Sequence, residues 1–268
     1  MYVLLFLVVP TLIAVGTGFF DKSGAFTLDT VAALGNPVVL DAFANSFALS
    51  AFTSVLGALV GAFACYGLLG ARPDGALRAV VDSLSGVLAQ FGGVMLAFAF
   101  VATIGIQGMV TLILRDTFGV DIFSGGVWLY ELPGLVLPYL YFQVPLMIIT
   151  FMPALLALKP NWAEANATLG GSRATYWLRI AGPVLAPSFL GSLLLLFANA
   201  FSSYATAAAL TSQGSQIVPL QIRSALTSET LLGRENLAGA LALGMIVVMV
   251  VVMAGYSVLQ ARAARWQR

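Results

Sequence analysis

The feature that most constrains this chain is a series of long apolar runs. A helix needs about 20 mostly apolar residues to cross a bilayer, and six stretches qualify: residues 1–20, 46–70, 79–105, 127–155, 184–210 and 237–260. The runs are continuous, which favours helices over the alternating strands of a membrane barrel. The first run has no basic lead or cleavage site, so we expect a retained span. The sequence therefore predicts an all-α integral membrane protein with six transmembrane helices, forming a single domain over residues 1–268.

The composition excludes several other classes. Of the 268 residues, 60% are hydrophobic and 9% are charged, whereas a soluble domain carries about 25% charged residues. The net charge of +1 excludes a nucleic-acid-binding protein, which needs a basic face. The chain has no histidine and one cysteine, so metal sites built from these residues and disulfide frameworks are excluded. Cys65 lies in an apolar run and is expected to be a small buried residue.

The charges of the loops predict the side of the membrane that each loop faces. Placing 71–78, 156–183 and the C-terminal tail on one side gives that side eight basic residues and three acids. The other side then holds four basic residues and eight acids. Basic residues collect on the cytoplasmic side, so we expect both termini and the 156–183 segment in the cytoplasm. The loops 21–45, 106–126 and 211–236 are expected outside, with some helix in them.

A polar passage, "EANATLGGSRATYWLRIAGPVLAP", interrupts the apolar runs after the fourth of them. Pro160, just before it, cannot extend the preceding helix. Asn161 is expected to cap a new helix, with Glu164 at the third helical position completing a capping box. The pattern predicts a short helix from Trp162 to Leu169.

The remainder of the passage predicts a second short helix. The pair Gly170–Gly171 supplies the left-handed backbone that ends the first helix. Ser172 is expected to cap the second, which runs to Ile180, and Gly182–Pro183 is expected to end it before the fifth span. These signals allow two interpretations: an ordinary hairpin at the membrane surface, or a helix that docks in another protein's groove.

The spacing of the passage resembles the EAA signature of permease subunits of bacterial type I ABC importers. In that signature E-A-A, then G, then I-x-L-P recur at fixed distances. Glu164 and Ala165 match its start, and the glycine, isoleucine and proline positions are matched by Gly170, Ile180 and Pro183, respectively six, sixteen and nineteen residues after the glutamate. Asn166 and Gly182 depart from the signature.

The resemblance implies the type I ABC importer permease fold, with a cytoplasmic coupling helix that lies in a groove on a separate ATPase. It implies no enzyme activity in this chain and no cofactor of its own, with ATP and Mg²⁺ on the partner ATPase. The implied partners are two ATP-binding subunits, a second permease subunit and an extracytoplasmic solute-binding protein, in a bacterial inner membrane. The residues implied in ATPase coupling are Glu164, Ala165, Leu169, Gly170, Ile180 and Pro183.

The resemblance covers residues 40–260 and bears on the solute. The stretches "GIQGMVTLILRDTFGVD" and "SSYATAAAL" look like the subgroup that moves polyamines, ferric iron, thiamine or sulfate. The excess of acids on the predicted outer side raises the local concentration of cations. Together they favour a polyamine or another small cation as the solute.

Polar groups within the apolar runs are candidates for the transport pathway, because a polar group facing lipid is costly. The candidates are Glu131, Gln143, Asn199, Ser202, Ser203 and Tyr204. The alternative for such groups is hydrogen bonding between helices. Asp82 is expected to pair with Arg78 one turn earlier. A secondary transporter or a channel subunit without ATP coupling remains the alternative function.

Overall fold

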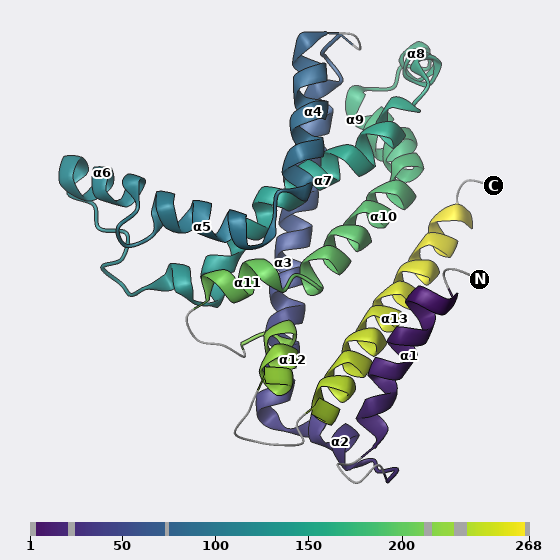
Figure 1. Ribbon diagram of the computed structural model, residues 1–268. Helices are drawn as coiled ribbons and strands as arrows, with labels where there is room; N and C mark the ends of the chain where they lie inside the picture. Colours follow the sequence, from purple (N-terminus) through teal and green to yellow (C-terminus); the bar gives the residue numbers. More distant parts are fainter. Residues whose placement is uncertain (1–3, 21–24, 73–74, 212–215, 228–234, 266–268) are drawn as a thin grey trace. The chain divides into compact units, whose positions relative to one another are not determined.

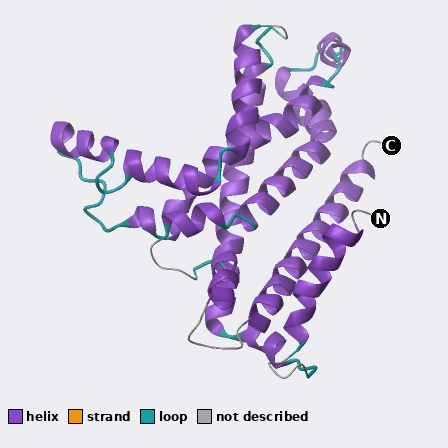
Figure 2. Cartoon of the chain, viewed as in Figure 1, coloured by secondary structure: helices purple, strands orange, loops and turns teal. Residues whose placement is uncertain are grey.

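The structure is a computed structural model that describes residues 4–20, 25–72, 75–211, 216–227 and 235–265 (Figure 1). Within these ranges every regular element is a helix, and Figure 2 shows this part of the chain as helices and loops without a strand. The predicted all-α class is confirmed.

The helices are mostly longer or more broken than the apolar runs alone suggest. In chain order they are α1 Val9–Gly16, α2 Asp29–Ala32, α3 Pro37–Leu68, α4 Ala76–Gln90, α5 Gly93–Ile104, α6 Met109–Phe118 and α7 Val136–Leu156. There follow α8 Pro160–Thr168, α9 Arg173–Tyr176, α10 Gly182–Phe201, α11 Ala205–Leu210, α12 Val218–Thr227 and α13 Glu235–Arg265. The loops expected to be partly helical do contain α2, α6 and α12.

Five helical stretches are long and apolar enough to cross a membrane. They are Pro37–Leu68, Gly93–Phe118, Leu132–Leu156, Arg173–Phe201 and Asn236–Val258, and Val9–Phe19 is a shorter apolar helix. The fifth predicted span, 184–210, begins earlier than expected and breaks after Phe201, where α11 follows as a separate helix. The chain is thus a multi-pass membrane protein.

The third predicted span, 79–105, is wrong as a single helix. α4 ends at Gln90 and α5 begins at Gly93, whose φ of 72° is a left-handed conformation that favours glycine. The Gly93 amide donates to Thr206 Oγ1 at 2.9 Å, so the break is held by a contact with α11. A window of apolar residues cannot detect this break, because the residues on both sides remain apolar.

The chain divides into two compact units, each with its own packing. The first comprises Met1–Leu49, Gly93–Leu135 and Phe201–Val251, and the second Ser50–Gly92, Val136–Ala200 and Val252–Arg268. In the first unit α5 packs on α11, and a small core gathers Val39, Ala42, Val218 and Leu241 from α3, α12 and α13.

In the second unit α3 and α7 meet along a close seam. A Cβ added to Gly57 would lie 2.9 Å from Gln143 Cβ, and one added to Gly61 would lie 2.5 Å from Met147 Cβ. Small residues at this i, i+4 spacing let the backbones of membrane helices approach closely. Cys65 lies further along the seam, fully buried as predicted, with its Sγ 3.9 Å from the carbonyl oxygen of Ile148.

The predicted ion pair on α4 is confirmed. Arg78 Nε lies 3.7 Å from Asp82 Oδ2, at the i, i+4 spacing of neighbours on a helix. The arginine is buried, whereas the carboxylate is half exposed. α4 packs on α7, so this pair belongs to the scaffold of the second unit.

Candidate functional site

The first short helix of the 156–183 segment starts earlier than the sequence predicts. α8 runs from Pro160 to Thr168, with Lys159 as its N-cap and no side-chain capping bond. The predicted capping box of Asn161 and Glu164 is therefore wrong. Proline fits the first helical turn, because it lacks only an amide that would have no helical partner there. Pro160 thus starts this helix, which places Asn161 inside it.

The turn after α8 agrees with the prediction. Gly170 has a φ of 78°, and its amide donates to the carbonyl of Ala167 at 3.0 Å. The next amide, of Gly171, donates to the carbonyl of Asn166 at 2.8 Å. These two bonds are the Schellman pattern, in which a left-handed residue lets two amides satisfy the last helical carbonyls. The turn direction is therefore set by Gly170.

Ser172 caps the second short helix, also as predicted. Its Oγ accepts the Thr175 amide at 3.2 Å, and its φ and ψ of −78° and 168° are those of an N-cap residue. The capped helix is α9, which spans Arg173–Tyr176.

Asn166 ties the two short helices together, a role that sequence reasoning missed. Its Nδ2 donates to the carbonyl of Ser172 at 3.1 Å, across the turn. A Cβ at Gly171 would overlap the amide group of Asn166, so a larger residue there would push this side chain away from its bond to Ser172. The sequence carried one signal for this role: Asn166 is an amide residue at a position where the signature that the segment resembles has alanine.

The second short helix does not end at Gly182–Pro183, so that prediction is wrong. The residues Trp177–Ala181 form a π-helical turn, in which the Gly182 amide donates to the carbonyl of Trp177, and α10 follows directly. A π turn re-routes the hydrogen bonds by one residue, which accommodates Pro183 without a break. Helix therefore continues from α9 through Ile180 into the membrane-spanning α10 (Figure 1).

The 156–183 segment is exposed at its tip and anchored at its base. No residue of α8 is buried, and Leu169 at its end is 88% exposed. Glu164, Ala165 and Gly170 are exposed as well. At the base, the Trp177 ring packs edge-on against Tyr66 of α3 with centroids 5.2 Å apart. The arrangement is a stiff, exposed element on a spanning helix, suited to binding another protein.

Among the pathway candidates, Gln143 lies between helices. It is 0% exposed, and its Nε2 donates to Thr53 Oγ1 of α3 at 3.0 Å. Its Oε1 is buried without a hydrogen-bond partner among the described residues. This geometry is the interhelical alternative that the sequence left open.

The other candidates fall into both units. Asn199 belongs to the second unit with Gln143, whereas Glu131, Ser202, Ser203 and Tyr204 belong to the first. Glu131 is exposed and ends the turn Trp128–Tyr130. The Tyr204 ring lies under the guanidinium of Arg223, with 5.9 Å from the guanidinium carbon to the ring centroid. Their part in a pathway remains a prediction.

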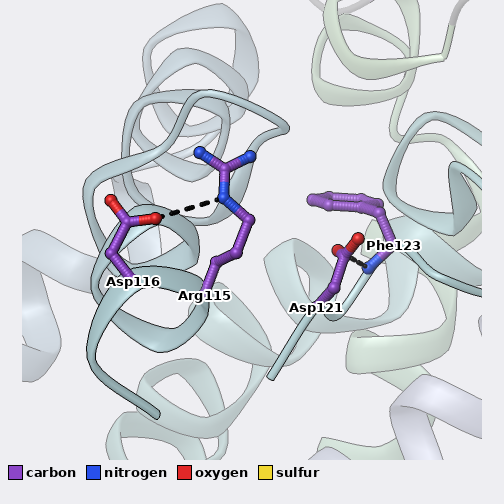
Figure 3. Close-up of polar contacts among 4 residues, drawn as sticks. All are labelled: Arg115, Asp116, Asp121 and Phe123. Carbon is purple, nitrogen blue, oxygen red and sulfur yellow. Dashed lines mark hydrogen bonds and ion pairs between the residues drawn. The ribbon is translucent and has the colours of Figure 1, made fainter. Parts of the chain in front are cut away.

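Polar side chains at the end of α6 and in the loop that follows it make local contacts. Figure 3 shows Arg115 Nε donating to Asp116 Oδ1 at 3.3 Å, and the Phe123 amide donating to Asp121 Oδ1 at 2.9 Å. The Phe123 ring stacks on Trp128 at 6.0 Å between centroids. Local contacts thus hold part of this predicted outer loop.

Comparison with known proteins finds relatives among ferric permeases. The chain is 26% identical over 200 residues to ferric transport system permease protein FbpB 1 of Haemophilus influenzae, and 26% identical over 200 residues to FbpB of Actinobacillus pleuropneumoniae. Each alignment covers 74% of this chain but only 31% and 28% of the relatives, so the chain spans about a third of their length. No protein-family model matches the sequence.

Comparison with solved structures shows the fold. A chain from a bacterial ABC transporter involved in the import of the acidic polysaccharide alginate matches with a TM-score of 0.75 and 16% identity, covering 97% of this chain and 91% of the other. A chain of the MetNI methionine ABC transporter, in inward facing conformations, matches with a TM-score of 0.58 and 13% identity, covering 89% and 99%. The predicted ABC importer permease fold is confirmed.

Proposed function

We propose that this chain is the permease subunit of an ABC importer, forming a solute route across the inner membrane that a separate ATPase drives. The observation that carries the proposal is the exposed α8–α9 element, which continues as unbroken helix into the spanning α10. The fold and the ferric-permease relatives support it. Those relatives are permease proteins, and the chain is accordingly not an enzyme by itself.

In this proposal α8 is the contact with the ATPase. Leu169 and the exposed face around Glu164 and Ala165 would enter a groove on the ATP-binding subunit. The Schellman turn at Gly170 and the bridge from Asn166 keep α8 at a fixed angle to α9. A movement of the ATPase groove is therefore passed to α10 and is not absorbed by the turn.

The assembly would contain two ATP-binding subunits, which hold ATP and Mg²⁺, a second permease subunit, and an extracytoplasmic solute-binding protein. The alignment covers about a third of each relative, which is consistent with a pair of permease units working together. Both termini and the 156–183 segment would lie in the cytoplasm, as the loop charges predict. Labelling of a cysteine placed at Ser172 from one side of the membrane tests this orientation.

For the solute, ferric iron replaces the polyamine that the sequence favoured. Both relatives are named for ferric transport. The exposed Glu131 is compatible with either cation. In the proposed system the solute-binding protein would deliver the iron to the outer side of the permease.

The test is reconstitution in proteoliposomes with an ATPase and a solute-binding protein from the same organism. We expect uptake of radioactive iron that requires ATP hydrolysis, with no uptake of labelled spermidine. Leu169→Glu should abolish ATPase binding and uptake, because a charge enters the apolar contact. Leu226→Glu, at an exposed leucine of α12, is the matched control and should retain both.

A chain that binds no ATPase, or that carries iron equally well without ATP, would contradict the proposal. ATP-driven uptake of spermidine and not of iron would contradict only the choice of solute.

A further inference from the structure

A polar groove lies beside α10 in the second unit. Its volume is about 490 Å³, and it is lined by Thr150, Pro153 and Ala154 of α7, by Pro187, Ser188, Gly191, Ser192 and Leu195 of α10, and by Tyr256 of α13. All three helices are among the stretches able to cross a membrane. The groove is therefore a hollow between spanning helices.

Four hydroxyl groups give the groove its polar character. Thr150 Oγ1 donates to the carbonyl of Leu146 at 2.9 Å, as a threonine within a helix does. Tyr256 OH reaches the carbonyl of Pro187 at a long 3.5 Å. Ser188 and Ser192 have no hydrogen-bond partner among the described residues, although Ser192 is only 5% exposed. A hydroxyl that lines a hollow without a protein partner can bind water or a ligand.

Two of the residues that line the groove are prolines within helices. Pro153 lies inside α7 and Pro187 inside α10, and neither residue has a backbone amide to donate. Gly191 makes room for the phenol, because a Cβ there would lie 3.1 Å from Tyr256 OH. Prolines are tolerated in membrane helices where the helix is packed in protein or lines a cavity.

A second hollow against α10 is the natural contrast. It has a volume of about 600 Å³ and is lined almost wholly by aliphatic and aromatic side chains, among them Leu59, Phe63, Phe151, Leu185, Phe189 and Leu190. That surface can face lipid chains at no cost. The hydroxyl groove cannot do so equally well, because hydrocarbon offers Ser188 and Ser192 no hydrogen bond.

We propose that the hydroxyl groove is a wall of the solute route, contacting the passing solute with its water shell through Thr150, Ser188, Ser192 and Tyr256. The inference rests on the proposed function and adds residues that the sequence analysis did not select. The four hydroxyl oxygens of the groove are the type of ligand that hard cations prefer. The described residues that line the groove include no carboxylate. Neutral hydroxyl groups bind a cation more weakly than carboxylates do, so a cation can both enter the groove and leave it, as conduction requires.

Accessibility of introduced cysteines to a charged, water-soluble thiosulfonate reagent tests the inference in the complete reconstituted complex. Ser188→Cys and Ser192→Cys probe the groove, and Leu190→Cys, on the apolar hollow of the same helix, is the matched control. The buried native Cys65 gives the background rate. We expect both groove cysteines to react at least about tenfold faster than Leu190→Cys, and iron uptake to stop once they are modified.

Equal rates for groove and control cysteines, in a complex that imports iron, would overturn the inference. So would modification that leaves uptake unchanged. Reaction in the isolated chain but not in the complex would assign the groove to contact with a neighbouring subunit, which also overturns it. Absence of ATP-driven uptake by the assembled unmodified complex is a separate result, because it rejects the proposed function whatever the labelling rates.

Discussion

The 156–183 segment and the α3–α7 seam are held in opposite ways. In the segment, the bonds from Gly171 to Asn166 and from Asn166 to Ser172 join residues five and six positions apart. In the seam, the bond between Gln143 and Thr53 joins residues 90 positions apart, amid tight packing. The segment is exposed and locally determined, whereas the seam is buried and depends on the rest of the unit.

This difference separates stability from function. A change in the seam alters the packing of two spanning helices, so it should lower the stability of the whole unit. A change in the segment disturbs an exposed element that carries little of the core, so it should spare stability and impair communication with a partner. The following variants test this separation, from the largest expected effect to the smallest.

Gly61→Ala should have the largest effect on stability. Its Cβ would lie 2.5 Å from Met147 Cβ, so helices α3 and α7 must separate, at a cost of about 2–3 kcal/mol. Gly67→Ala on the same helix is the control, since nothing lies within 4 Å of its Cβ, and the more helix-favouring alanine should be neutral or stabilising. Thermal unfolding in detergent measures both. Equal losses of stability at the two positions would contradict the close packing of α3 on α7 at Gly61.

The Thr53–Gln143 pair should show strong coupling. Thr53→Val leaves the buried Gln143 amide group without its acceptor, which costs about 2 kcal/mol. Adding Gln143→Leu should restore most of that loss, because it removes both the amide group and the unpaired Oε1. A double-mutant cycle of unfolding free energies measures the coupling. Additive losses would show that the two side chains act independently.

Gly170→Val should impair transport with little change in unfolding temperature. A left-handed backbone costs a β-branched residue about 1–2 kcal/mol locally, and Gly170 has open space around it, so no clash adds to this cost. Gly170→Asn is the control, because asparagine tolerates this conformation better. Uptake and ATPase binding are compared with thermal unfolding of the same samples. Normal iron uptake by the valine variant would show that transport does not depend on the turn at Gly170.

The sequence predicted best what is decided locally. The left-handed turn at Gly170 and the cap at Ser172 follow from the residues themselves and were correct. The prediction of a capping box at Asn161 was wrong because Pro160, one residue earlier, fits the first helical turn and so starts the helix. The prediction of one helix over 79–105 was wrong because the break between α4 and α5 depends on a contact with Thr206, far along the chain.

The seam and the hydroxyl groove were not predicted for a similar reason. Gly57 and Gly61 carry a readable signal, two glycines four apart in an apolar run, which indicates close helix packing. Their partner on α7, however, is set by the tertiary fold. Ser188 and Ser192 are ordinary helix residues in sequence and become a site only when Tyr256 and Thr150 come beside them.

Asn166→Ala should have the smallest effect, about 0.5–1 kcal/mol on the local turn. It removes the bond to the Ser172 carbonyl and restores the alanine of the EAA signature. Hydrogen exchange of the Ser172–Thr175 amides should become several-fold faster, while exchange in α7 stays unchanged. Thr168→Ala, which loses only a bond within α8, is the control. Unchanged exchange across the turn would show that Asn166 holds nothing in place.

The π-helical turn at Trp177–Ala181 makes the second short helix and the fifth span into one lever. The helical stretch Arg173–Phe201 has 29 residues, which is about 43 Å at 1.5 Å per residue. Over that length a tilt of about 5° at one end displaces the other by about 4 Å, roughly the width of a small solute. The Trp177–Tyr66 contact lies near the short end, where a fulcrum gives the greatest amplification. A small displacement at the short end is thereby enlarged at the far end of α10.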